Sequence, residues 1–117
     1  MKRVTVEDIV ATVDELYPNT YEQKEKEKWI SDVEREIKQN IILTHYDPDE
    51  KRENELYAFA PYHEIYTYYV EAQIDKNNGE YDRYSNHMAL YNNLYAEFEA
   101  YYHRNHMPVQ HCKFKLV

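Results

Sequence analysis

Seven large side chains recur between positions 81 and 102 with spacings of 3, 4, 3, 4, 3 and 4 residues. They are Tyr81, Tyr84, Met88, Tyr91, Tyr95, Phe98 and Tyr102. A repeat that averages 3.5 residues keeps its members on one side of an α-helix, so the pattern predicts one long helix from about Glu80 to Asn105. The only glycine of the chain, Gly79, stands just before it. Dinucleotide-binding and compact all-β folds need glycine at several tight turns, so an all-α fold is predicted.

Three shorter helical patterns precede the long one. The first follows Thr5, whose hydroxyl suits a helix N-cap, and ends before Pro18. The second runs from Thr20 to about Ile42, and the third from Pro61 to about Lys76. Asn77-Asn78-Gly79 leaves too short a connection for anything except an antiparallel hairpin. We therefore predict a bundle of about four helices over residues 1–107, ending in a long helical hairpin, with these side chains buried: Trp29, Tyr84, Tyr91, Tyr95 and Phe98.

The composition and charge of the chain disfavour several classes of function. The chain has 14 tyrosines among 117 residues, so tyrosine rings must supply much of the core. Its net charge is −8, and no stripe of basic residues marks a surface that grips nucleic acid or an anionic membrane. A single cysteine excludes an internal disulfide, and neither a signal sequence nor a membrane-spanning run is visible. These features predict a soluble, acidic domain that is made inside the cell and is not secreted.

The pattern changes after Pro108. Apolar and basic residues alternate there with a period of two, which predicts an extended strand over residues 108–117 that has no partner strand in its own chain. We expect this tail to dock on another protein or on a neighbouring subunit. Tyrosines outside the main helical stripes are expected to add to the contact. The predicted interface residues are Val109, Cys112, Lys113, Phe114, Lys115, Leu116, Val117, Tyr68 and Tyr101. The alternative is that the tail folds back and covers its own bundle.

Catalytic and metal-binding patterns are weak. His103, His106, His111 and Cys112 lie within ten residues and are all possible zinc ligands. A closed site would require the last two to fold back, whereas histidines near a helix C-terminus also complement the helix dipole without any metal. No Glu-x-x-His pair, complete His-Glu-x-x-His motif or nucleophile elbow is present. The sequence therefore predicts no enzyme, no metal and no cofactor.

Three stretches in the second half of the chain are similar to a known family. They read Ala60-Pro61-Tyr62-His63-Glu64-Ile65-Tyr66-Thr67-Tyr68-Tyr69, Asn78-Gly79-Glu80-Tyr81-Asp82-Arg83-Tyr84-Ser85-Asn86 and Met88-Ala89-Leu90-Tyr91-Asn92. Over residues 56–107 the chain resembles the small all-helical head–tail connector proteins (adaptor or head-completion proteins) of long-tailed phages and prophages.

The resemblance implies a structural virion protein that forms a ring, dodecameric in the family, beneath the portal and continues the DNA channel to the tail. The implied partners are the portal protein, the next neck or tail-completion protein and further copies of the chain. DNA would pass through the lumen without specific binding. The implied location is the virion neck, after assembly in the bacterial host cytoplasm. The alternative from another class is a small acidic regulator or inhibitor that binds one host or phage protein.

Overall fold

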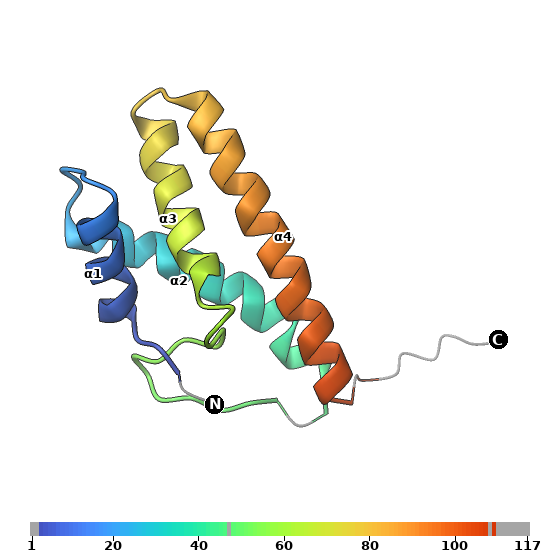
Figure 1. Cartoon of the computed structure of the whole chain (residues 1–117). Helices are drawn as coiled ribbons and strands as arrows, with labels where there is room; N and C mark the ends of the chain where they lie inside the picture. Colours follow the sequence, from blue (N-terminus) through green and yellow to red (C-terminus); the bar gives the residue numbers. More distant parts are fainter. Residues whose placement is uncertain (1–2, 47, 108, 110–117) are drawn as a thin grey trace.

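A computed structural model describes residues 3–46, 48–107 and 109, and it is all-α (Figure 1). The four α-helices are α1 (Val6–Leu16), α2 (Gln23–Asn40), α3 (Glu64–Asn77) and α4 (Tyr81–Asn105), with a 3₁₀ helix, η1 (Ile42–Thr44), after α2. Helix α3 packs against each of the other three α-helices and is the centre of the fold. The predicted bundle of about four helices with a long C-terminal hairpin is confirmed.

Helix α1 begins where its sequence provides a cap. The Thr5 hydroxyl accepts a hydrogen bond from the Asp8 N–H, and the Asp8 carboxylate accepts one from the Thr5 N–H. This capping box satisfies two backbone donors that a helix start otherwise leaves free. Ile9, Val10 and Val13 then form the buried side of the helix.

Helix α2 begins three residues later than predicted, because the Asn19 side chain holds the preceding turn. Its amide donates to the Tyr17 carbonyl, and its oxygen accepts from the Tyr21 N–H. The predicted burial of Trp29 is wrong, since its ring is only partly buried. Trp29 lies at the edge of the buried stripe and packs edge-on against Tyr21, with ring centroids 5.9 Å apart.

Helix α3 begins at Glu64 and not at Pro61. Residues 59–62 form a turn, in which the Tyr62 N–H donates to the Phe59 carbonyl at 2.6 Å. The hairpin to α4 is as predicted: Gly79 has a φ of +77°, a left-handed conformation that glycine adopts without strain. Buried side chains surround α3 on most sides, as expected for a helix covered by three others.

Among the helices, only α3 has its backbone close to the backbone of α4. No Cα atom of α4 lies within 8 Å of one in α1 or α2, and all three helices are fully described. The distance between α4 and α2 is larger, and tyrosine side chains bridge it. For example, the Tyr91 hydroxyl of α4 donates to the Glu36 carboxylate of α2 at 2.9 Å. Tyr91 and Phe98 are buried as predicted, but Tyr84 and Tyr95 are only partly buried. The reason is that no backbone of α2 lies within 8 Å of α4, which leaves these two tyrosines less covered.

Candidate docking site

The chain turns back on itself just after α4 ends. The Tyr46 N–H donates to the Met107 carbonyl at 3.0 Å, and the Val109 N–H donates to the Thr44 carbonyl at 2.8 Å. Two bonds of this crossed pattern define a short antiparallel pair. Val109 is the one residue of the predicted strand that the structure describes, and it bonds to the backbone of its own chain, contrary to the sequence expectation. No sequence pattern indicates this partner, because residues 44–46 follow a helix and are too few to show the alternation of a strand.

Exposed apolar side chains gather around this backbone pair. Leu43, Tyr46 and Met107 are 48%, 56% and 71% exposed, respectively. Val109, one of the predicted interface residues, is partly buried beside them. Exposed apolar groups that cluster at one place on a small protein mark a surface for another molecule. We call these four residues the docking end.

A buried histidine supports the docking end from beneath. His45 is only 2% exposed, and its Nδ1 lies 2.6 Å from the Ile41 carbonyl oxygen. Because a carbonyl only accepts, Nδ1 carries the proton, which leaves the Nε2 lone pair directed at His103 Nδ1, 3.1 Å away. Burial lowers the pKa of His45, and the neighbouring His103 and His106 lower it further. His45 is thus held neutral, in one tautomer and one orientation.

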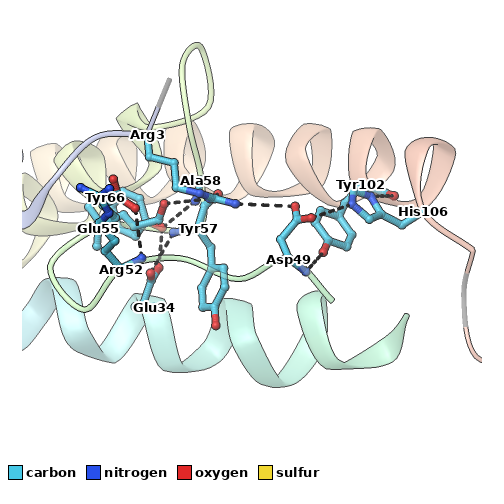
Figure 2. A network of polar contacts seen from close by, with 11 residues as sticks. Arg3, Glu34, Asp49, Arg52, Glu55, Tyr57, Ala58, Tyr66, Tyr102 and His106 are labelled. Atoms are coloured by element: carbon cyan, nitrogen blue, oxygen red, sulfur yellow. Dashed lines mark hydrogen bonds and ion pairs between the residues drawn. The ribbon is translucent and has the colours of Figure 1, made fainter. Parts of the chain in front are cut away.

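A second set of contacts ties the end of α4 to the loop that follows η1 (Figure 2). The rings of Tyr102 and His106 stack in parallel with centroids 3.7 Å apart. His106 Nε2 lies 3.2 Å from the Asp49 carboxylate, and the Tyr102 hydroxyl accepts from the Asp49 N–H at 3.1 Å. Arg3 lies 3.8 Å from Asp49 and donates to the Leu56 carbonyl. The N-terminal arm, the loop and α4 are therefore fixed relative to one another.

The same loop is anchored on α2 by Glu34 (Figure 2). This carboxylate accepts from the Tyr57 N–H at 2.8 Å and from the Tyr66 hydroxyl at 2.5 Å, and Lys51 lies 3.6 Å from it. Burial raises the pKa of Glu34, while these donors act in the opposite direction. The Ala58 N–H donates to Tyr66 in turn. A rigid support for the docking end follows from this network.

The two tyrosines predicted at an interface lie on a different surface. The Tyr101 ring packs against Phe59 and Tyr62, with centroids 5.7 and 5.3 Å away. The Tyr68 hydroxyl donates to Glu64 at 3.0 Å. Both tyrosines are partly buried, and Tyr68 borders a hollow between α3 and α4. None of these contacts involves the docking end. The other predicted interface residues lie outside the described residues: Cys112, Lys113, Phe114, Lys115, Leu116 and Val117.

The histidine-rich region contains a member that the sequence analysis missed. His45 is distant in sequence but joins His103 and His106 in space. Only its contact across 58 residues brings it there, so no local motif could have indicated it. Among the described residues, no three His, Cys, Asp or Glu side chains are grouped to hold a metal ion. His111 and Cys112, the other two candidate ligands, fall outside the described part of the chain.

A second polar cluster joins three helices in the interior. His87 Nδ1 lies 2.6 Å from the Asp75 carboxylate, and its Nε2 lies 3.1 Å from Glu71. The Tyr17 hydroxyl also donates to Asp75. Burial, and then this hydrogen bond to Asp75, raise the pKa of Tyr17 to about 12. Both nitrogens of His87 are occupied, so the cluster is built to hold α1, α3 and α4 together and presents no free base.

Comparisons with protein-family models, curated proteins and solved structures find no match for this chain. None of the helices in the described part of the chain combines the length and the apolar character needed to cross a membrane.

Proposed function

We propose that the protein is a head–tail connector, a structural component of the neck of a tailed phage or prophage. The observation that carries the proposal is the docking end, where four apolar side chains surround the point at which a basic tail leaves an acidic bundle. The rigid support beneath it suits a protein that presents a fixed contact surface. The sequence resemblance over residues 56–107 supplies the class of partner, which is the portal protein.

The charge of the chain is suited to this role. The segment 108–117 contains two lysines and no acidic residue, which leaves 12 basic against 22 acidic residues in the rest of the chain. An acidic ring repels the DNA phosphates, so the duplex passes through the lumen without binding. A basic tail is attracted to an acidic partner and is steered toward it. In this proposal the tail and docking end contact the portal, and the surface that carries Tyr68 and Tyr101 contacts a neighbouring subunit or the next neck protein.

The experiment measures capture of the chain by a phage portal protein. Tyr46→Ser and Met107→Ser each remove an exposed apolar side chain from the docking end, and both are expected to weaken capture at least about tenfold, as loss of an interface anchor does. Leu16→Ser is the matched control, because Leu16 is 66% exposed but lies on α1. Equal capture of all three variants would contradict the assignment of the docking end.

The regulator alternative gives a different result in the same experiment. A small acidic regulator would remain a monomer, ignore the portal and bind one host or phage protein instead. The docking end could contact that partner equally well. Mass measurement in solution, with and without portal, separates the two classes of function.

A further inference from the structure

Basic side chains form a stripe along the exposed side of α2. Spacings of 4, 7 and 3 residues place them on one side of the helix: Lys24, Lys28, Arg35 and Lys38. All four are exposed, whereas buried residues of α2 such as Ile30 and Ile37 lie on another side. Acidic residues alternate with the stripe along the sequence, so the stripe becomes visible only once the helix has formed.

The lysines of this stripe lack acidic partners. Four of the five acidic side chains of α2 already have a partner: Glu27 has Gln23, Asp32 has Arg35, Glu34 has Tyr57 and Tyr66, and Glu36 has Tyr91. Within the described part of the chain, Lys24, Lys28 and Lys38 form no ion pair. Lys24 and Lys28 are one helical turn apart and repel each other. An acidic surface of another molecule would therefore stabilise the stripe.

Two hollows adjoin each other along α3. One lies between α1 and α3 and the other between α3 and α4, and Glu64 and Tyr68 border both of them. Their volumes are about 190 and 280 Å³. Leu16, which is 66% exposed, lines the first, and Leu90, which is 46% exposed, lines the second. Among the described residues that line these hollows, none belongs to α2 and none is a lysine or an arginine.

The two hollows carry an excess of negative charge. Glu64 and Glu97 are exposed, and neither forms an ion pair with another described residue. Burial raises the pKa of Tyr68, and the hydrogen bond to Glu64 and the charges of Glu64 and Glu71 raise it further. Helix α1, which forms one wall, contains four acidic residues and no basic residue. This surface therefore favours a cation.

A lysine or arginine side chain suits the hollow between α3 and α4 in both of its parts. Such a side chain packs its aliphatic stem on apolar groups and keeps its charged end at a polar rim. Leu90 and Leu94 provide the apolar wall, and Glu64 and Glu97 provide carboxylates. The stripe and the hollows share no residue, so one copy of the chain presents both surfaces at the same time.

We propose that the basic stripe of α2 docks on the two hollows of a second copy of the chain, with its lysine side chains packed on Leu90 and paired with Glu64 and Glu97. Because the two surfaces differ, each copy keeps one of them for a further copy, and the contact extends into a ring or an open chain. This inference deepens the proposed function and rests on it for the setting, in which it names the surface that a neighbouring subunit contacts.

The first test measures self-association of the full chain by sedimentation, without any portal. At low salt the chain is expected to form species larger than a dimer. At 1 M salt, where the screening length is about 3 Å, it is expected to return to monomers. A chain that stays monomeric at low salt overturns the proposal. A monomer that binds duplex DNA at low salt assigns the stripe to nucleic acid and overturns the proposal as well.

Charge reversal identifies the two surfaces. A stripe-reversed chain (Lys24→Glu with Lys28→Glu) and a hollow-reversed chain (Glu64→Lys with Glu97→Lys) are each expected to associate at least about tenfold more weakly, because like charges then face each other. Circular dichroism checks that both keep their helical content. An equimolar mixture of the two, or one chain with all four changes, pairs opposite charges again and is expected to recover association. Full association of either reversed chain, or no recovery in the mixture, contradicts the proposal.

The matched control is Arg52→Glu with Arg104→Glu. Both arginines are exposed and lie outside the stripe and the hollows, and the net charge changes as much as in the stripe-reversed chain. This control is expected to associate like the unmodified chain. An equal loss in the control would show that net charge and not the stripe governs association, which overturns the proposal. Since no portal takes part, failure here leaves the assignment of the docking end unaffected.

Discussion

The two halves of α4 carry the same repeat of large side chains but experience different surroundings. In the C-terminal half, Phe98 and Tyr102 are fully buried, whereas in the N-terminal half Tyr81 is 65% exposed. Only the C-terminal half has the loop after η1 and the start of α3 packed around it, through Phe59, Tyr62 and Asp49. Spacing determines which side of a helix faces inward, and the elements opposite determine how deeply each residue is buried.

The largest expected effect is at Phe98, and it tests this comparison directly. Phe98→Ala is expected to lower the free energy of unfolding by about 3–5 kcal/mol, because it leaves a cavity beneath Phe59 and Tyr62. Tyr81→Ala, at the exposed end of the same repeat, is expected to change it by less than about 0.5 kcal/mol. Chemical denaturation measures both. Similar losses in the two variants would show that the repeat is buried uniformly.

In its N-terminal half, α4 is held to α3 by polar contacts of His87 with Glu71 and Asp75. His87→Ala is expected to lower the free energy of unfolding by about 1–3 kcal/mol, because Glu71 loses its hydrogen-bond partner and Asp75 keeps only the Tyr17 hydroxyl. His103→Ala, which removes a more exposed histidine of the same helix, provides the control and is expected to cost about 1 kcal/mol or less. Equal losses would mean that the interior cluster adds no stability of its own.

Alkaline pH is expected to destabilise the whole fold through tyrosines whose pKa is raised by burial. Burial raises the pKa values of Tyr17, Tyr66 and Tyr102 in the folded chain, to about 12 for Tyr17. A raised pKa in the folded state stabilises the fold fully below the unfolded value near 10, and this contribution is lost as the pH rises through the folded value. Between its unfolded and its folded pKa, each such tyrosine lowers the free energy of unfolding by at most about 1.4 kcal/mol per pH unit. Denaturation between pH 9 and 12 checks this slope, and a stability that stays level over that range would contradict it.

The smallest expected effect on stability is at the docking end. Met107→Ser and Tyr46→Ser are expected to change the free energy of unfolding by less than about 0.5 kcal/mol, since both side chains are more than half exposed. Thermal or chemical denaturation measures this. A loss of 2 kcal/mol or more would place these side chains in the core and remove the reason to regard them as a free surface.

Local patterns in the sequence were sufficient to predict the helices. The capping group at Thr5, the repeat from Tyr81 to Tyr102 and the turn at Gly79 all act within a few residues, and the structure confirms each of them. Boundaries were missed where a side chain acted on the backbone outside the helix, as Asn19 does before α2.

The docking end could not be predicted in the same way. Its support depends on contacts across more than 50 residues, such as His45 with His103 and Asp49 with Tyr102. Neither partner shows an unusual local pattern, so the contacts appear only in the folded chain. Of the predicted interface residues, Val109 belongs to the docking end. Tyr68 bonds to Glu64, and Tyr101 packs against Phe59 and Tyr62.

The most direct test of the proposed role is the mass of the complex formed with the portal ring. Native mass spectrometry compares the full chain with a chain that lacks residues 110–117. The proposed function predicts that the full chain adds several copies to one portal ring, while the truncated chain keeps its helical content and fails to bind. A truncated chain that assembles on the portal as well as the full chain, or a full chain that stays a monomer beside it, would contradict the proposal.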